Sequence, residues 1–412
     1  MIEIKPLDQI RSSGAQALDR TSKLQKKSES RKSILDHLRH FAASVPDFRR
    51  TGKGNIRHRL SDMLALIIFA RMSKCVGRAE IIAFGERNLG KFHKMGMLLR
   101  GVPSEATLCR VSQGIDELKL EEEMRKLMDL FQQDKPKARP DPDVVCVDGK
   151  AMRGTVQQNG RSPDVVSAYS PASGITLATE ACQEKSNEIT AVPKLLDKLD
   201  IEGRIITADA MSMQKAIIDK IREKKADFVI ELKANQRSLR YGIEDRLKGA
   251  IPVSVHAEGP ALGHGRIETR TYRVYDGLGL IADRKKWGGG LSVISFESET
   301  VVKSTGELKT ERRLYISSLS PGTPRIGSLI RRHWMIESMH WSLDCNLLQD
   351  RIKRKTTRAA RNLDTIQRIV LSLFSIWRNR RRKLSDKAKG TAELMRTLAM
   401  SFANLKRFMA QK

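Results

Sequence analysis

The stretch DVVCVDGK, residues 143–150, marks the point where the sequence changes from a helical to a strand-like pattern. Four apolar residues, 144–147, precede Asp148, and Gly149 follows it. A short apolar run that ends at turn residues is typical of a buried strand. Ligands of open α/β sheets gather at the carboxyl ends of strands, so Asp148 becomes a candidate site residue.

Further strands and helices alternate beyond this point. Strands are predicted at 164–170, 174–182, 204–210 and 227–233, and helices at 188–199, at 213–225 and after 236. Three successive strands followed by alternating helices and strands predict an α/β fold, a mixed sheet with helices on its faces. Short β-like pieces at about 250–318 predict a β-rich insertion, and the chain becomes helical again from Ile326.

The regions on either side of this sheet have other patterns. Residues 1–30 are polar and aperiodic, which predicts a flexible tail. Residues 31–133 have helical spacing and predict an all-α domain, and residues 134–143 predict a linker. Within the α domain, GVPSEATLCRVSQGI (101–115) is either the second helix of a helix-turn-helix or a capped core helix. Residues 384–412 are interpreted as a basic C-terminal tail.

The charge of the chain indicates an anionic partner. It holds 76 Lys and Arg against 48 Asp and Glu, a net charge of +28 in 412 residues. Such an excess is typical of proteins that handle nucleic acid, although a solvated basic surface or an anionic membrane would also suit it. Five scattered cysteines argue against a zinc module or a disulfide framework and favour a reducing cytoplasm. The longest apolar run, residues 63–70, is too short to span a bilayer, so we expect a soluble protein without a membrane partner.

Two acids end predicted strands, and a third lies on a later helix. Asp148 and Asp209 each follow an apolar strand, where aspartate is also a common turn residue. In RRHWMIESMHWSLD (331–344), helical spacing places a polar stripe between flanking apolar residues. The stripe consists of His333, Glu337, His340 and Asp344, and the flanking residues are Trp334, Trp341, Ile336 and Leu343.

The polar stripe requires a partner, because burying unpaired carboxylates is costly. A metal or a basic partner would meet this need, and an ordinary helix that packs its indoles while arginines bind its acids would meet it too. A zinc site at His333, Glu337 and His340 lacks the H-E-x-x-H spacing. Asp148, Asp209 and Glu337 together favour two Mg²⁺ or Mn²⁺ ions, which suit phosphoryl transfer on nucleic acid.

Seven motifs, taken in order, resemble those of the DDE transposases of bacterial insertion sequences, in particular the ISAs-type family with the H-repeat-associated proteins. The motifs are VVCVDGKAMRG (144–154), EKSNEITAVPKLL (184–196), TADAMSMQ (207–214), DFVIELKANQ (227–236), HGRIETR (264–270), YISSL (315–319) and RRHWMIESMHWSLD (331–344). The resemblance covers residues 33–382, and the N-terminal part is similar to the family's helical associated domain.

This resemblance implies an RNase H-like catalytic domain at 140–383 with catalytic Asp148, Asp209 and Glu337 binding two divalent ions. It implies hydrolysis at the element's ends, strand transfer of the freed 3′-hydroxyls into target DNA, a homodimer on double-stranded DNA, and a cytoplasmic, nucleoid-associated bacterial protein. The residues expected to contact DNA or to orient the acids are Lys150, Arg153, Lys185, Asn187, Lys233, Gln236, Arg266, Arg351, Lys353 and Arg354. Residues 351–383 hold twelve Lys and Arg against one acid, which predicts a basic face along a phosphate backbone.

Three positions depart from the family pattern. Ser338 follows the catalytic glutamate where the family usually has Asn, Gln349 precedes Asp350 where a Glu is usual, and Ala234 replaces a Gly. All three carboxylates remain. Two alternatives stay open beside an active transposase: a catalytically silent DNA-binding descendant and a general nuclease.

Overall fold

The computed structural model describes residues 32–50, 54, 56–133, 143–156, 160–182, 188–263, 265–289, 291–324 and 326–411. The tail expected at 1–30 and residues 134–142 of the expected linker lie outside these ranges. The chain divides into two compact units. Unit 1 comprises Met1–Val111, Leu118–Lys137 and Trp377–Lys412, and unit 2 comprises Ser112–Glu117 and Ala138–Ile376.

Unit 1 is helical, as the spacing of its apolar residues predicts. Its first helices are α2 (Ile34–Ser44), α3 (Leu60–Met72), α4 (Arg78–Arg87) and α5 (Leu89–Lys94), and most of α6 (Glu105–Gly114) and α7 (Glu117–Gln133) belongs to it as well. Apolar residues occur on every side of helix α3 and most of the helix is buried, which makes it the centre of the unit. Ser33 and Asp36 form a capping box that fixes the start of α2.

Residues 384–412, which the sequence presents as a basic tail, contain helices α13 (Leu384–Lys387), α14 (Thr391–Met400) and α15 (Phe402–Met409). The apolar residues of α14 and α15 recur every three or four positions, and Leu394, Leu398 and Phe402 among them are buried. The Phe402 ring lies 5.2 Å from that of Phe92, centroid to centroid. The interpretation as a tail is therefore corrected: the basic residues mask two amphipathic helices that complete the core of unit 1.

Unit 2 is built on one nine-stranded sheet with the order β3-β2-β1-β4-β5-β9-β8-β7-β6. Strand β1 runs parallel to β4, and β4 runs parallel to β5, whereas the other neighbours are antiparallel. The first five strands are β1 (Val144–Ala151), β2 (Asp164–Ser170), β3 (Ile175–Ala181), β4 (Ile205–Ala208) and β5 (Asp227–Leu232). The sheet is mixed and flanked by helices, which confirms the α/β prediction.

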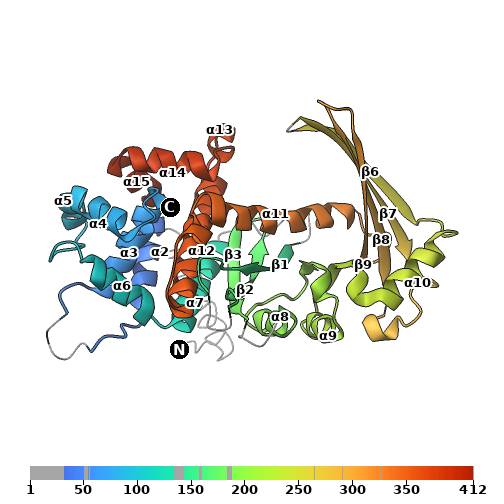
Figure 1. Cartoon of the computed structure of the whole chain (residues 1–412), viewed down its shortest axis with the longest axis horizontal. Coiled ribbons are helices and arrows are strands. Elements are labelled where there is room, and N and C mark those ends of the chain that lie inside the picture. The colour runs from blue at the N-terminus through green and yellow to red at the C-terminus, as the bar shows by residue number, and fades with distance from the viewer. Residues whose placement is uncertain are drawn as a thin grey trace, which may run out of the picture. The chain divides into compact units, whose positions relative to one another are not determined.

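The helices of unit 2 cover both faces of the sheet. They are α8 (Glu188–Asp197), α9 (Lys215–Glu223), α10 (Arg237–Leu247), α11 (Ile326–Cys345) and most of α12 (Thr357–Arg380). Helices α8 and α9 lie on one side of strands β1–β3, and α11 crosses on the other side (Figure 1). Because α11 contacts β1 and β4, its residues reach the strands that carry the two aspartates.

The β-rich segment forms β6 (Ser254–Gly263), β7 (Arg266–Asp276), β8 (Ser292–Val302) and β9 (Leu308–Ser317). Strand β9 pairs with β5, so these strands extend the central sheet instead of forming a separate one. Their ends reach well beyond α11 (Figure 1). None of the helices in the described part of the chain is long and apolar enough to cross a membrane.

Candidate active site

Strand pairing brings the two aspartates side by side. In the parallel pair of β1 and β4, Val147 is the partner of Ala208. Asp148 and Asp209 are the next residues along the chain from these two partners. Neighbouring strands lie about 4.8 Å apart, so the two acids occupy adjacent positions at the same edge of the parallel strands.

Helix α11 brings Glu337 to this edge. Its two histidines hold it against the strands: His333 Nδ1 lies 3.2 Å from Thr207 Oγ1, and His340 Nδ1 lies 3.4 Å from Asp148 Oδ2. Glu337 stands four residues after His333 and three before His340, a spacing that puts all three on one helix face. The Glu337 side chain is exposed at the helix surface, but neighbouring atoms partly shield its carboxyl from water. This partial burial raises the pKa of the carboxyl, and the charge of Asp148 raises it further.

A fourth carboxylate, that of Glu188, joins the three that the sequence predicts. Glu188 begins α8, and its side chain lies on the backbone of Gly149, where an added Cβ would clash with Glu188 Oε1. Burial and the charges of Asp209 and Asp148 raise the pKa of Glu188 to about 7. Glu188 belongs to the EKSNEI motif, so its place beside predicted Lys185 and Asn187 is the signal in the sequence that could have found it.

Burial and the charges of neighbouring carboxylates raise the pKa values of Glu188, Asp209 and Glu337. Burial raises the pKa of Asp209, with the Asp148 charge as the second cause, while Lys233 acts in the opposite direction. Hydrogen bonds from the backbone of Met211 and Ser212 also lower the pKa of Asp209 without cancelling the increase. Asp148 Oδ1 accepts the amide of Gly149 at 2.9 Å. Oxygen donors with excess negative charge are the ligands that Mg²⁺ and Mn²⁺ prefer. Among the described residues, however, no three His, Cys, Asp or Glu side chains form a group arranged to hold a metal ion.

The two tryptophans of α11 behave differently. The Trp334 ring packs edge-on against Phe296 at 5.7 Å, and the Arg313 guanidinium lies 5.6 Å from the Trp334 centroid. Trp341 is 60% exposed, so this indole is not packed as the ordinary-helix alternative requires. The rotation of α11 is fixed instead by buried Ile336 and Leu343, together with the two histidine contacts.

Behind α11, a buried polar network ties it to α12. Arg368 is completely buried, and its Nε donates to Asp364 Oδ2 at 2.8 Å. Gln349 Nε2 donates to the other oxygen of Asp364 at 2.8 Å, and Arg368 Nη1 lies 3.5 Å from Met339 Sδ on α11. Arg368, one of the twelve basic residues counted for the face predicted at 351–383, is therefore not on the surface. This side chain points inward because a buried carboxylate pairs with it.

The predicted DNA-contacting residues fall into three groups. The first group has protein partners: Lys150 Nζ binds Asp344 at 2.8 Å, and Gln236 Nε2 donates to the Met213 carbonyl at 2.9 Å. Lys233 also belongs here, because it pairs with Glu231 at 3.0 Å while remaining 57% exposed. These contacts hold Lys150 and Gln236 to other groups of the protein in this structure.

The second group lies beside β1 and is open to solvent. The loop after β1 carries exposed Arg153, and a Cβ on Gly154 would meet the Ile352 carbonyl at 2.6 Å. The Arg354 amide donates to the Gly154 carbonyl at 3.2 Å, and Arg351 and Lys353 are exposed in the same segment. The structure thus brings these cations together from two distant stretches. In the third group, Arg266 is exposed at the start of β7, and Lys185 and Asn187 lie outside the described residues.

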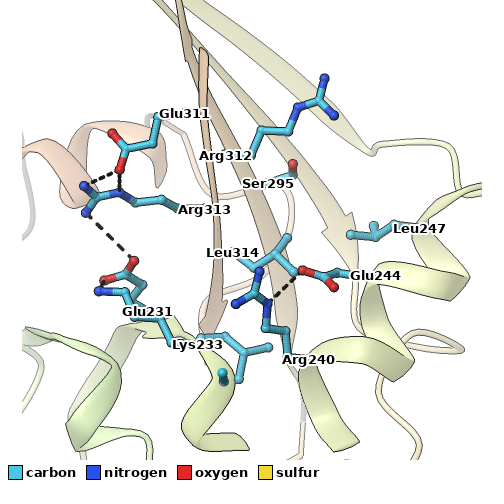
Figure 2. A pocket seen from close by; sticks show the side chains of 12 residues that line it. Glu231, Lys233, Arg240, Glu244, Leu247, Ser295, Glu311, Arg312, Arg313 and Leu314 are labelled. Carbon is cyan, nitrogen blue, oxygen red and sulfur yellow. Dashed lines mark hydrogen bonds and ion pairs between the residues drawn. The ribbon is translucent and has the colours of Figure 1, made fainter. Parts of the chain in front are cut away.

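A cavity of about 510 Å³ adjoins this site (Figure 2). In Figure 2, Arg313 bridges Glu311 and Glu231, and Arg240 pairs with Glu244. Arg313, which lines the cavity, lies over the ring of Trp334 on α11, which places the cavity next to that helix. Its acids and bases largely neutralise one another, in contrast to the carboxylates around Asp148.

Comparison with known proteins identifies the arrangement. Residues 139–373 match the family described as "Transposase DDE domain", and residues 38–128 match the family described as "DDE_Tnp_1-associated". The chain belongs to the DDE transposases. Within this family, the transposase is 33% identical over 356 residues to "Putative transposase YncI" of Escherichia coli O157:H7, a match that covers 83% of this chain and 87% of the relative.

Two further proteins are similar to the transposase. It is 32% identical over 355 residues to "H repeat-associated putative transposase YhhI" of Escherichia coli strain K12, covering 84% of this chain and 90% of the relative. A solved structure described as "Cryo-EM structure of piggyBac transposase synaptic complex with hairpin DNA (SNHP)" has a TM-score of 0.45 and 13% identity, covering 93% of this chain and 78% of that one. The resemblance to the H-repeat-associated group is thereby confirmed.

Proposed function

We propose that this transposase cleaves the ends of its mobile element and transfers the freed 3′-hydroxyls into target DNA. The observation that carries the proposal is the register that sets Asp148 beside Asp209, under a helix whose His340 reaches Asp148. An RNase H-like core is part of the proposal, and it is supported by the order β3-β2-β1-β4-β5 with helices on both faces.

Asp148, Asp209 and Glu337 are the residues that would hold two Mg²⁺ or Mn²⁺ ions. Bound there, the ions would activate the attacking oxygen and stabilise the leaving oxygen of a phosphodiester. Glu188 adds a fourth carboxylate next to Asp148 and Asp209. Burial lowers the pKa of His340, and its Nδ1 lies 3.4 Å from Asp148 Oδ2, so its ring is placed to orient that carboxylate.

The DNA partner in this proposal is double-stranded and includes both the element's ends and the target. Arg153, Arg351 and Lys353 are exposed close to β1 and would contact phosphates beside the scissile position. Since two ends must be cut and joined together, we propose a homodimer on paired ends.

The decisive experiment compares carboxylate variants on a duplex that carries the DNA flanking the gene. Asp148→Asn, Asp209→Asn and Glu337→Gln are expected to lower Mg²⁺-dependent cleavage at least about 1,000-fold, or about 4 kcal/mol of transition-state stabilisation. DNA affinity in the absence of metal should stay within a few-fold of wild type. Wild-type cleavage by any one of the three variants would defeat the proposal.

Matched controls come from the same unit. Asp219 and Glu223 are exposed on α9, where they pair with Lys215 and Lys220. Asp219→Asn and Glu223→Gln should therefore leave cleavage unchanged. The same assay separates the alternatives: salt-sensitive binding without nicking in Mg²⁺ or Mn²⁺ indicates a silent DNA-binding descendant, and cutting without preference for the ends indicates a general nuclease.

A further inference from the structure

Unit 1 contains a second charged site, a cavity of about 370 Å³ far in sequence from the catalytic acids. It is bordered by residues 48–50 and 56–58, between α2 and α3, and by one side of α6. The residues that line it are Phe48, Arg49, Arg50, Ile56, Arg57, His58, Thr107, Arg110 and Val111. We refer to it as the arginine pocket.

The arginine pocket has a large excess of positive charge. Four of its lining residues are arginines and none is an acid. Asp47, next to the pocket, binds Arg49 with an N–O distance of 2.6 Å. The remaining guanidinium contacts go to neutral oxygens: Arg57 Nε donates to the Arg100 carbonyl at 3.2 Å, and Arg110 Nη2 donates to Thr107 Oγ1 at 3.3 Å.

Arg50 differs from the other three. It is exposed at the pocket, and it makes no hydrogen bond or ion pair with any residue in the described ranges. Elsewhere in the chain an exposed arginine can find a carboxylate, as Arg358 does with Glu117 at 2.8 Å. The arginine pocket therefore presents guanidinium groups whose charge the described residues do not balance.

The pKa of the pocket histidine, His58, also reflects the excess of positive charge. The pKa of His58 is lowered by burial first, and then by the positive charges of Arg57 and Arg49, against a smaller opposing effect of Asp62. Clustered cations repel one another, and an anion placed among them would remove the repulsion. Guanidinium groups are well suited to phosphate, because their planar N–H donors match two oxygens at once.

We propose that the arginine pocket binds a phosphate of the duplex DNA backbone. The proposal rests on the proposed function in that DNA is the substrate, and it assigns to unit 1 a contact separate from those of unit 2. Duplex backbone fits better than an unpaired base, because Phe48, 42% exposed, is the single aromatic ring among the lining residues apart from His58. Phosphate contacts position a protein on DNA without reading the base sequence. The pocket would therefore fix where the DNA backbone lies and would not select a DNA sequence.

The test measures DNA binding by the full chain with divalent ions chelated, which separates binding from cleavage. Arg50→Ala/Arg110→Ala should weaken binding and make the slope of log affinity against log salt less steep by about 1–2, since each lost phosphate contact removes about 0.9 from that slope. The loss should be equal on the element's end and on a scrambled duplex. A loss confined to the end sequence would overturn the assignment to phosphate.

A matched control removes two charges elsewhere in unit 1. Lys94 on α5 and Arg396 on α14 are exposed and outside the pocket. Lys94→Ala/Arg396→Ala should change the slope by less than half as much as the pocket variant. An equal change would show that only total charge matters and would overturn the proposal. Both variants should unfold within about 2 °C of wild type, because exposed side chains contribute little to stability.

The two proposals can fail separately. If Asp148→Asn abolishes cleavage while the pocket variant keeps the wild-type salt slope, the pocket assignment falls and the transposase chemistry stands. If wild type never cuts but the pocket variant flattens the slope, the pocket assignment stands and the proposed chemistry falls.

Discussion

The acidic cluster around Asp148 and the arginine pocket of unit 1 are both groups of like charges that the protein leaves partly unbalanced. They are built in opposite ways. The acids come from positions 148, 188, 209 and 337, at two strands and on two helices of unit 2. The arginines are Arg49, Arg50 and Arg57, which follow α2, and Arg110 on one short helix.

This difference shows how the surroundings determine the cost of a charge. Burial is the largest cause of the raised pKa values of Glu188, Asp209 and Glu337, so packing of the core must hold these groups in place. At the arginine pocket, Arg50 and Arg110 remain exposed, and water screens their repulsion. We therefore expect changes behind the acidic cluster to have large effects and changes at the pocket to have small effects on stability.

The largest expected effect is at Arg368, which supports α11 from behind. Arg368→Met leaves buried Asp364 without its ionic partner and should lower the free energy of unfolding by about 3–5 kcal/mol. Arg358→Ala, which removes an exposed partner of Glu117, should cost no more than about 1 kcal/mol. Urea denaturation of both variants measures the difference. Equal losses would mean that α12 does not act as the support of α11.

The next largest effect is expected at Glu188. Glu188→Gln keeps the shape of a side chain that lies on Gly149 but removes its charge, and it should lower metal-dependent cleavage about 10–100-fold. The reference is Glu180→Gln on β3, since Glu180 pairs with Lys198 at 3.0 Å. Cleavage is measured at saturating DNA over a series of Mg²⁺ concentrations. Unchanged rates and an unchanged Mg²⁺ requirement would remove Glu188 from the site.

The pH dependence of stability provides a smaller effect. A carboxyl whose pKa is raised by folding stabilises the folded state below its unfolded pKa, and that stabilisation is lost as pH rises through the folded pKa. For Glu188 the window runs from its ordinary 4.5 to about 7. The metal-free protein should therefore unfold a few degrees lower at pH 7.5 than at pH 5, and Mg²⁺ should restore the loss at the higher pH.

Glu188→Gln tests the origin of this pH dependence. The variant should show a smaller decrease in unfolding temperature between pH 5 and pH 7.5, because one of the titrating groups is gone. Thermal unfolding followed by circular dichroism at the two pH values suffices. A decrease as large as that of wild type would assign the pH dependence to groups outside the acidic cluster.

The smallest effect on stability is expected when one charge is removed from the acidic cluster or from the arginine pocket. The comparison is made on protein free of metal and DNA. Arg50→Ala should change the free energy of unfolding by no more than about 0.5 kcal/mol, because the side chain is exposed. Asp148→Asn should stabilise the metal-free protein, since three neighbouring carboxyls lose a repelling charge. Urea denaturation in a chelating buffer compares them. Destabilisation by Asp148→Asn would contradict the description of the cluster as repulsive.

The sequence predicts the sheet well because its signals are local. Apolar runs that end at turn residues, such as 144–147 before Asp148, predict strands without any knowledge of their partners. The chain order of strands and helices in unit 2 agrees with this prediction, and the register then places Asp148 next to Asp209.

The errors occur where a residue's role depends on burial or on a partner far away in sequence. Glu188 matters because Gly149, 39 positions earlier, leaves room for its carboxyl. Asp364, the partner of Arg368, is only four positions away, but the sequence does not show that both side chains are buried or that Gln349 donates to the other oxygen of Asp364. The sequence at 384–409 is rich in lysine and arginine, which masks its helical spacing. In the structure, Leu394 and Phe402 from these helices are buried in the core of unit 1.

Unit 1 draws on residues from both the beginning and the end of the described chain, and this has a consequence for synthesis on the ribosome. The Ile34 amide donates to the Gln411 carbonyl at 2.8 Å, and Phe92 stacks edge-on against Phe402. Helices α2–α5 emerge first during translation, yet their last packing partners are made some three hundred residues later. A nascent or prematurely terminated polypeptide would therefore display an incomplete first unit, and quality-control proteases would be expected to remove it before it could occupy DNA.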